Sequence, residues 1–318
     1  MKVSVIIPVK NGEATLERCL ESISKQTIFK DIEIIILDSD STDNSRGIAL
    51  RFGALIIAVP KGKFNHGLTR NQGIMTANGN LIYFTVQDAW IPENDMLEKM
   101  AAHFLMPDVK GVSGHQAVPS EQNKNPLVWF KRYSTPVIET RKISDQSKFE
   151  LLSKDHLVSL IAWDNVVAMY MRSALVEQPF VETEYAEDCI WSYNALKKGW
   201  TLIYDSSLVV YHYHHRNYSY SYKMNYALNY HFYKFFSRIP SLPPIIIPII
   251  KATYHLLKNH KLNFKEKIYW IFHNYSSQMG HYFSNLDFLY RLKIKGNNNL
   301  DARYKKVCNS IPQGFQKK

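Results

Sequence analysis

The feature that most constrains this chain is a regular alternation, between residues 3 and 86, of short apolar runs with segments of helical spacing. The apolar runs are rich in β-branched residues, as is typical of strands buried on both faces, and they occupy residues 3–9, 31–38, 54–59 and 81–86. Between them, helices are expected at 16–23, where apolar side chains recur on one face, and at 44–52 and 68–78. This alternation predicts an α/β fold with a right-handed, doubly wound, mostly parallel sheet.

The rest of the chain adds a second half to this fold and a different C-terminal region. Residues 119–164 show no clear periodicity, and they are followed by a helix that ends near Gly199 and a strand at 201–211. Prolines at 241–248 forbid a continuing helix. We therefore expect a separate helical and basic region towards the C-terminus.

Polar residues gather where the expected strands end. The clusters are 38–43, 66–71 and 87–88. Ligands of open parallel sheets bind at the carboxyl ends of the strands, so the sequence predicts that these clusters share one site.

Three residues near strand ends have side chains that bind divalent cations. Asp88 would suit a cation held by oxygen, although a helix cap or a turn residue is an equal alternative. His212 and His214 would face the same side of a continuing strand, where imidazole could bind a transition metal or a phosphate. Either histidine could instead pack at a domain edge, and we expect at least one of them to act in the site.

Two further segments have the chemistry of a catalytic base or of a phosphate site. Glu187 and Asp188 open a helix whose N-terminal dipole favours an ionised carboxylate, so one of them could be a base or merely a favourable helix end. Arg70 and Asn71 begin a helix after Gly67, where an arginine and helix-start amides could hold a diphosphate. The alternative is an exposed helix start with a surface arginine.

The charge of the chain is concentrated at one end. The net charge is +11, and residues 251–318 contain 13 Lys or Arg against 3 Asp or Glu, a local net of 13 − 3 = +10. A basic, aromatic region could meet nucleic acid, an anionic membrane or only water. Nucleic acid is disfavoured because no binding module is recognised, and the adjoining LPPIIIPII favours a lipid interface. No apolar stretch approaches 18 residues, so no membrane-spanning helix is expected.

The cysteines and the N-terminus exclude other classes of protein. Cys19, Cys189 and Cys308 form no CxxC pair, which excludes a thiolate zinc site of the usual kind and fits a reducing cytoplasm. The apolar run at the N-terminus is shorter than a signal peptide requires and reads as a first strand.

Four segments, taken in order, resemble a known family. They are VSVIIPVKNGEATLERCLESISKQT, IIILDSDSTDNS, TRNQGIMTANGNLIYFTVQDAWIP and YAEDCIWSYNALKKGW. Over residues 1–215 they are similar to the family 2 inverting glycosyltransferases of the GT-A fold. Within that family, FNHGLTRN, QDA in place of DxD, AEDCIWS and VYHYHH look most like bacterial rhamnosyltransferases of O-antigen and exopolysaccharide assembly.

The resemblance implies a domain division and a role for each matching residue. Residues 1–100 would be the nucleotide-binding half, 101–215 the acceptor half, and 216–318 a C-terminal region. Asp188 would be the catalytic base, and a metal would be held by Asp88 with His212 or His214. Val86 stands at the first aspartate position of DxD, which leaves fewer carboxylates for a cation. Ser39 stands where many members have a second aspartate in the turn that would hold the nucleotide. The residues implied to bind the nucleotide sugar are Pro8, Val9, Asn11, Asp38, Ser39, His66, Arg70, Gln87 and Asp88.

The resemblance also implies the partners. The donor would be a nucleotide-diphosphate sugar, with dTDP-L-rhamnose favoured and a UDP-hexose or UDP-N-acetylhexosamine as the alternative, and the cofactor Mg²⁺ or Mn²⁺. The acceptor would be a lipid-linked oligosaccharide, which places the protein in the cytoplasm and peripherally on the inner leaflet of the membrane. A homodimer is left open. An inactive member that serves as a membrane scaffold is an alternative of another class, against which the joint presence of Asp88, Asp188 and Arg70 speaks.

Overall fold

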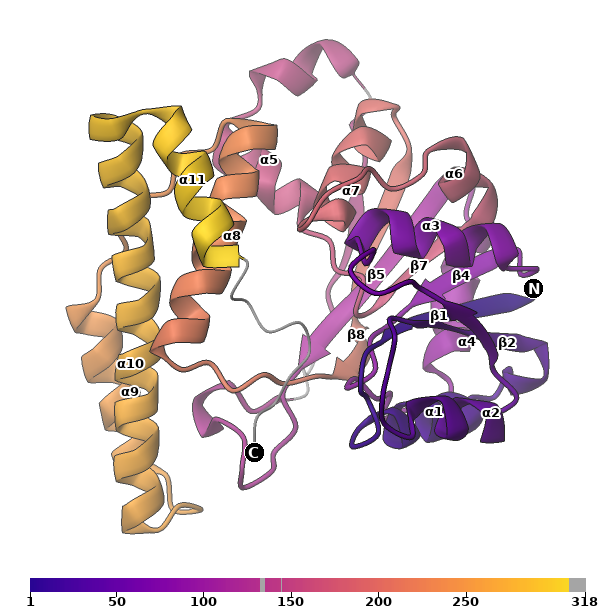
Figure 1. Ribbon diagram of the computed structural model, residues 1–318, viewed down its shortest axis with the longest axis horizontal. Coiled ribbons are helices and arrows are strands. Elements are labelled where there is room, and N and C mark those ends of the chain that lie inside the picture. The colour runs from indigo at the N-terminus through magenta and orange to yellow at the C-terminus, as the bar shows by residue number, and fades with distance from the viewer. Residues whose placement is uncertain (132–134, 144, 309–318) are drawn as a thin grey trace. The chain divides into compact units, whose positions relative to one another are not determined.

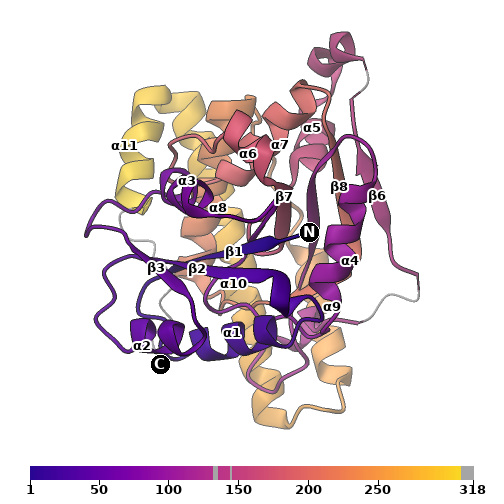
Figure 2. The ribbon, with the colours of Figure 1, turned by 90° about the vertical axis from the view of Figure 1, so that its right-hand side faces the viewer.

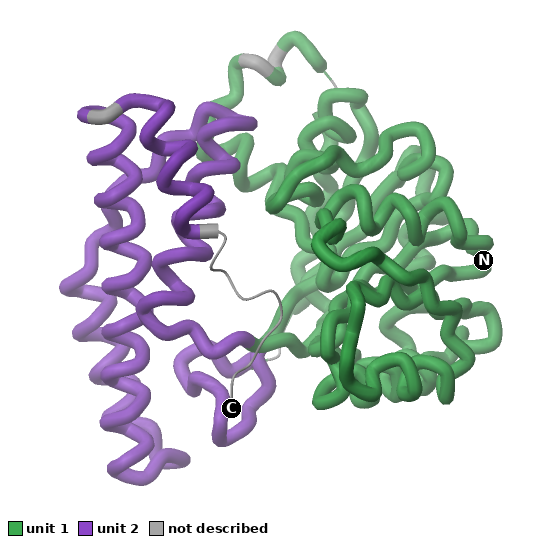
Figure 3. Tube along the Cα trace, in the orientation of Figure 1, with its two compact units in different colours: residues 1–117, 131–213 green, residues 118–130, 214–318 purple. Residues whose placement is uncertain are grey.

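The computed structural model describes residues 1–131, 135–143 and 145–308. Over this range the chain forms two compact units (Figure 3). The first comprises residues 1–117 and 131–213, and the second comprises residues 118–130 and 214–318, of which 309–318 lie outside the described part. Each unit is described by itself below.

The first unit is built on one sheet, in which the described residues form eight strands (Figure 1). The strand order is β3-β2-β1-β4-β7-β5-β8-β6. The strands are β1 (Val3–Val9), β2 (Ile32–Asp38), β3 (Leu55–Ala58), β4 (Leu81–Phe84), β5 (Val109–Ala117), β6 (Ile138–Arg141), β7 (Ala168–Met171) and β8 (Thr201–Tyr211).

The mostly parallel sheet predicted from the sequence is confirmed, with two strands that run the other way. Strands β1 to β4 pair in parallel, as do β5 and β8. Strand β7 lies antiparallel between β4 and β5, and β6 pairs antiparallel with β8. Residues that precede β7 therefore lie at the same edge as the carboxyl ends of β4, β5 and β8.

Helices cover both faces of the sheet because successive strand residues point to opposite sides. Val5 and Ile7 of β1 pack in one core cluster with Leu16 and Leu20 of the first helix, whereas Ile6 faces the third helix at Gly73. Figure 2 shows α1 and α2 on one side of β1 and β2 and α3 on the other. The helices of this unit are α1 (Leu16–Ser24), α2 (Ser45–Arg51), α3 (His66–Thr76), α4 (Met96–Ala102), α5 (Lys154–Ile161), α6 (Arg172–Glu177) and α7 (Glu187–Lys197).

Most local expectations agree with these elements. The left-handed φ of +77° at Gly199 ends α7 as expected. The N-cap of α1 is Thr15. Asn11 lies in the preceding turn, where it adopts a left-handed φ of 46° and its side chain accepts from the N–H of Thr42. Short 3₁₀ turns occupy Phe29–Asp31, His103–Leu105, Pro126–Val128 and Gln146–Leu151.

The second unit is helical. It contains α8 (Tyr218–Phe236), α9 (Ile246–Lys258), α10 (Phe264–Tyr290), a π-helical turn at Arg291–Lys295, and α11 (Asn297–Cys308). The break expected at 241–248 separates α8 from α9, and Pro248 lies in the first turn of α9, where its missing N–H costs nothing. Residues 118–130 belong to this unit because Leu127 and Trp129 pack beside the buried Trp270. No helix of the described residues combines the length and the apolar character needed to cross a bilayer.

Gly67 fastens α3 to the segment that leads into α7. A Cβ atom built on Gly67 would stand 2.0 Å from the carbonyl oxygen of Val181. The neighbouring Asn71 donates to the carbonyl of Phe180 (2.8 Å) and accepts from its N–H (3.1 Å). Gly67 therefore lets the backbone of α3 approach Val181 closely.

We predict that Gly67→Ala lowers the free energy of unfolding by about 1–3 kcal/mol, because the backbone of Val181 must move. The same change inside an unobstructed helix would normally stabilise by about 1 kcal/mol. Gly47→Ala in α2 is the matched control, since its Cβ would meet only the side chain of Asn44. Urea unfolding measures both variants, and equal effects would contradict the role assigned to Gly67.

Candidate active site

The ends of β4 and β8 are joined, although they lie far apart in the sequence. Trp90 and Tyr211 exchange two backbone hydrogen bonds, Trp90 N to Tyr211 O at 3.0 Å and Tyr211 N to Trp90 O at 2.8 Å. Their rings pack at 5.7 Å between centroids. This bridge holds the segment after β4 beside the end of β8, and so brings Asp88 to His212.

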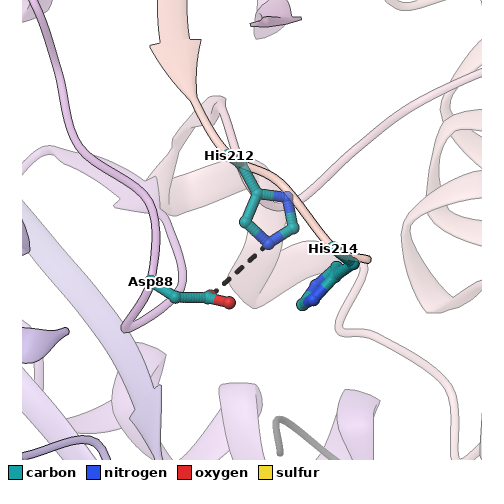
Figure 4. Close-up of side chains that lie close together, drawn as sticks. All are labelled: Asp88, His212 and His214. Atoms are coloured by element: carbon teal, nitrogen blue, oxygen red, sulfur yellow. Dashed lines mark ion pairs between the residues drawn. The ribbon is translucent and has the colours of Figure 1, made fainter. Parts of the chain in front are cut away.

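Asp88, His212 and His214 form a group that could hold a metal ion (Figure 4). One ligand atom from each lies within 4.8 Å of the others. His212 Nε2 is 3.4 Å from Asp88 Oδ1, and the two side chains are 10% and 16% exposed. His214 follows His212 by two residues and is the first residue of the second unit.

The chemistry of this donor set fits a divalent cation. Carboxylate oxygen suits Mg²⁺ and Mn²⁺, and neutral imidazole suits transition metals. One carboxylate with two imidazoles therefore favours Mn²⁺ over Mg²⁺. The structure brings together the three residues that the sequence suggested as metal ligands.

The end of β1 and the turn after β2 form a second polar region. Val9 lies beside Asp38 in the parallel register, and its carbonyl accepts from the N–H of Ser39. The Asn11 side chain accepts from the N–H of Thr42 at 2.8 Å. Pro8, Val9, Asn11, Asp38 and Ser39 thus lie together, as the sequence predicted.

The side chains of Asp38 and Ser39, both in that turn, differ in what they contact. The Asp38 carboxylate is 1% exposed and bonds to Arg46 Nε at 2.6 Å, so it shapes the turn. Among the described residues, the buried hydroxyl of Ser39 has no hydrogen-bond partner. A buried hydroxyl of this kind is suited to a bound ligand.

The side chain of Gln87, which follows β4, bonds to the backbone of Lys10, which follows β1. Its Oε1 accepts from the N–H of Lys10 (2.8 Å), and its Nε2 donates to the carbonyl of Lys10 (3.3 Å). A Cβ on Gly12 would stand 2.9 Å from the same side chain. Within the described contacts, Gln87 therefore holds the loop that carries Asn11.

Arg70 is buried in an ion pair. Its side chain is 5% exposed, and its Nη1 lies 3.0 Å from Glu187 Oε1 and 3.0 Å from the carbonyl oxygen of His66. Burial opposes ionisation of Glu187, but Arg70, His66 and Asn165 outweigh it and hold the pKa of Glu187 below its usual range. Burial lowers the pKa of His66, and Arg70 lowers it further against the effect of Glu187. The pair joins α3 to the first turn of α7.

Asp188 differs from its neighbour. It is partly exposed. Burial of the carboxyl group and the charges of Glu187 and Asp164 raise the pKa of Asp188 well above its usual range, against two backbone N–H donors, Asn165 at 3.1 Å and Cys189 at 2.8 Å. The pKa of Glu187 is thus lowered and the pKa of Asp188 raised, although the two acids are adjacent on one helix turn.

The backbone that presents these acids is strained. Ala186, the N-cap of α7, has φ 64° and ψ 27°, a left-handed conformation that costs a non-glycine residue about 1–2 kcal/mol. Such strain concentrates at functional sites. It turns the chain so that Glu187 enters the core while Asp188 stays accessible.

Sequence reasoning missed Asn165, Asp164 and Gln116. Asn165 donates from its backbone to Asp188 and from its side chain to Glu187 (3.0 Å), and it accepts from the Tyr170 hydroxyl (2.6 Å). Asp164 and Asn165 precede the antiparallel strand β7, and Gln116 lies near the end of β5. Polar residues in a short gap before an apolar run were the available signal.

Comparison with known proteins agrees with this geometry. Residues 4–157 match Glycosyl transferase family 2. Residues 4–157 are thus similar to the family 2 glycosyltransferases. It is 29% identical over 222 residues to the O-antigen chain rhamnosyltransferase RfbN of Salmonella typhimurium, over 67% of each chain. It is also 29% identical to the O-antigen chain rhamnosyltransferase WbaN of Salmonella anatum, over 66% of each chain.

Solved structures show the same fold as this glycosyltransferase. The mannosyltransferase PcManGT of Pyrobaculum calidifontis, solved with GDP-Man and Mn²⁺, superposes with a TM-score of 0.55 at 17% identity, over 97% of this chain and 79% of that one. TarS 1–349 of S. aureus with UDP gives a TM-score of 0.53 at 16% identity, over 91% of both chains. At these identities the likeness concerns the GT-A fold.

We predict opposite stability effects for the two neighbouring acids. Glu187→Gln leaves Arg70 buried without its counter-charge and should destabilise by about 3–5 kcal/mol. Asp188→Asn removes repulsion from Glu187 and Asp164 and should stabilise by about 0.5–2 kcal/mol at neutral pH. Urea unfolding near neutral pH measures both, and a shift in the same direction would contradict the assignment.

The sign of each effect follows from linkage. The lowered pKa of Glu187 means that its stabilisation is present above the unfolded-state pKa and is lost as the pH falls through the folded-state pKa. The raised pKa of Asp188 means that its destabilisation begins as the pH rises through the unfolded-state pKa. The gain from Asp188→Asn should therefore shrink towards acid pH.

Proposed function

We propose that this glycosyltransferase moves a sugar from a nucleotide diphosphate to an acceptor hydroxyl with inversion, and that Asp188 is the catalytic base. The observation that carries the proposal is the first turn of α7. There Asp188, a partly exposed residue whose carboxyl group has a raised pKa, stands beside a buried acid that Arg70 neutralises. A raised pKa makes the ionised carboxylate a better proton acceptor.

Asp188 would take the proton of the acceptor hydroxyl as that oxygen attacks the anomeric carbon. The bond from this carbon to the diphosphate breaks on the opposite face, so the configuration inverts, as is typical of the family. A cation held by Asp88, His212 and His214 would stabilise charge on the leaving diphosphate. Pro8, Val9, Asn11, Asp38 and Ser39 would line the nucleotide, with His66, Arg70 and Gln87 completing that side of the site.

The sugar donor that we propose is dTDP-L-rhamnose. It is supported by the two relatives named above, which are both described as O-antigen chain rhamnosyltransferases. The acceptor that we propose is a lipid-linked oligosaccharide at the cytoplasmic face of the membrane. UDP-hexose and UDP-N-acetylhexosamine are the donors to test against this proposal.

We predict that Asp188→Asn lowers turnover by about 10²- to 10⁴-fold, the usual contribution of a general base, while donor binding is kept. Turnover of the wild type should rise with pH through the raised pKa of Asp188, and the variant should lose this dependence. Assays use dTDP-L-rhamnose, UDP-glucose and UDP-N-acetylglucosamine with Mn²⁺, and donor binding is read from thermal stabilisation. Glu177→Gln, on the exposed end of α6, is the control.

Near-normal turnover of Asp188→Asn would remove Asp188 from the mechanism. Thermal stabilisation by a UDP-sugar alone would contradict the proposed donor but would not contradict the role of Asp188 as the base. A wild-type protein that no nucleotide sugar stabilises would favour the scaffold alternative.

We further propose that the second unit docks on an anionic membrane surface. Helix α10 carries an exposed row whose members lie three or four residues apart, except for one gap of eight between Tyr275 and Phe283, and several recur after eleven, so the row runs almost parallel to the helix axis. At 27 residues, α10 is about 40 Å long. The row consists of Phe264, Ile268, Phe272, Tyr275, Phe283, Leu286 and Tyr290, which are between 38% and 75% exposed.

The neighbouring helix has the same character. On α9 the exposed apolar residues are Ile246, Ile247, Ile250, Tyr254 and Leu257. Residues 246–290 carry five lysines, at positions 251, 258, 261, 265 and 267, against Glu266 and Asp287. Asp287 is already paired with Arg291 and Arg303. Exposed apolar and aromatic residues beside lysines are typical of helices that lie in a lipid interface, where each lysine contributes about 1 kcal/mol.

We predict that replacing Phe264, Ile268 and Phe272 together by serine abolishes sedimentation with vesicles of phosphatidylcholine and phosphatidylglycerol. Because these side chains are 75%, 38% and 67% exposed, the fold should survive. Wild-type binding should weaken with salt. The control replaces Leu50, Met75 and Leu105, which are 64%, 70% and 77% exposed in the first unit. Unchanged vesicle binding, or a variant that converts a dimer into a monomer, would show that lipid does not cover this row.

A further inference from the structure

Gln116 lies between a histidine of the candidate metal group and a buried carboxylate. Its Oε1 is 2.9 Å from Nδ1 of His212, and its Nε2 donates to Oδ2 of Asp164. All three residues belong to the first unit. The contacts form a continuous path from Asp88 through His212 and Gln116 to Asp164.

The sheet fixes these three positions. Gln116 is the penultimate residue of β5, and the N–H of His212 donates to the carbonyl of Ala117 at 3.0 Å, which continues the parallel pairing of β5 and β8. Asp164 lies just before β7, whose antiparallel course brings it to the same edge. Its other oxygen accepts from the N–H of Val166 at 2.9 Å. These backbone positions bring the side chains of Gln116, His212 and Asp164 to the same edge of the sheet.

The carboxylate decides which way the amide of Gln116 points. An ionised carboxylate only accepts hydrogen bonds, whereas an amide has an NH₂ group that donates and an oxygen that accepts. The described contacts place the NH₂ group of Gln116 against Oδ2 of Asp164 and its Oε1 against His212. An oxygen can bond to Nδ1 of His212 only if that nitrogen carries the proton.

We propose that Gln116 and Asp164 are positioning residues that fix His212 as its Nδ1–H tautomer, so that Nε2 presents a lone pair towards Asp88. In this tautomer two acceptors face each other across 3.4 Å, and both could serve as ligands of a cation, which would offset their repulsion. A neutral imidazole with its other nitrogen hydrogen-bonded is the usual state of a metal-bound histidine. The inference rests on the proposed function for the identity of the site, but it concerns the metal-free protein as well.

The tautomer can be measured directly. Nitrogen-15 NMR of the imidazole rings, recorded without metal at a pH where His212 is neutral, distinguishes a protonated from an unprotonated ring nitrogen. The His212 signals are assigned by their loss in His212→Gln. We expect Nδ1 to be protonated and Nε2 unprotonated.

Three variants test the path. Gln116→Leu removes the acceptor, so the proton should move to Nε2 beside Asp88, and affinity for Mn²⁺ alone should fall about 10- to 100-fold. Gln116→Glu keeps an acceptor for Nδ1–H and should keep the wild-type tautomer. Asp164→Asn removes the group that orients the amide and should give a mixture of tautomers. Affinity is measured from the electron paramagnetic resonance signal of unbound Mn²⁺.

A matched control is available in the same unit. His103 and Asp205 form another histidine–carboxylate contact, 2.9 Å long, outside the candidate site. Asp205→Asn should leave the His212 tautomer and the Mn²⁺ affinity unchanged. Thermal unfolding of every variant separates a local effect from loss of the fold.

The results distinguish this inference from the proposed function. An Nε2–H tautomer in the wild type, or an unchanged tautomer in a folded Gln116→Leu variant, would overturn the positioning role. A wild-type protein with the Nδ1–H tautomer that binds no Mn²⁺ would support the positioning role and overturn the proposed cation site.

Discussion

The reversal of β7 relative to β4 and β5 fixes where the acidic groups of the site lie. In a wholly parallel sheet, residues before a strand would lie at the edge opposite to the ligand. Because β7 runs backwards, Asp164 and Asn165 reach the edge where β4, β5 and β8 end. Asn165 then contacts both acids of α7, and Asp164 contacts the amide that orients His212.

Around that edge, the buried carboxylates of Glu187 and Asp38 are each paired with an arginine. Arg70 neutralises Glu187 inside the protein, and this allows a second carboxylate, Asp188, to stand one residue away. Asp38 is also paired with an arginine, but the side chain of that residue, Arg46, is half exposed; this pair holds the turn after β2. Asp188, the base that we propose, differs from both paired acids in its raised pKa.

The sequence predicted the parts of this fold that depend on local patterns. Apolar runs predicted β1 to β4 and β8, and polar residues near strand ends suggested Asp88 and His212. The opening of a helix, together with the family resemblance, suggested Asp188. It did not predict that Arg70 would be buried against Glu187, because burial depends on α7 packing beside α3. It also missed Asn165 and Gln116, since no local pattern reveals that β7 is antiparallel.

The left-handed Ala186 has a consequence for how this enzyme would respond to laboratory evolution. The turn stores unfavourable backbone energy, and the carboxylate that it presents is itself repelled by its neighbours. A search for heat-resistant variants that ignored catalysis would gain most easily by relaxing this one corner, with glycine at the turn or an amide in place of the acid. Under the role proposed for Asp188, selection for sugar transfer would preserve this turn.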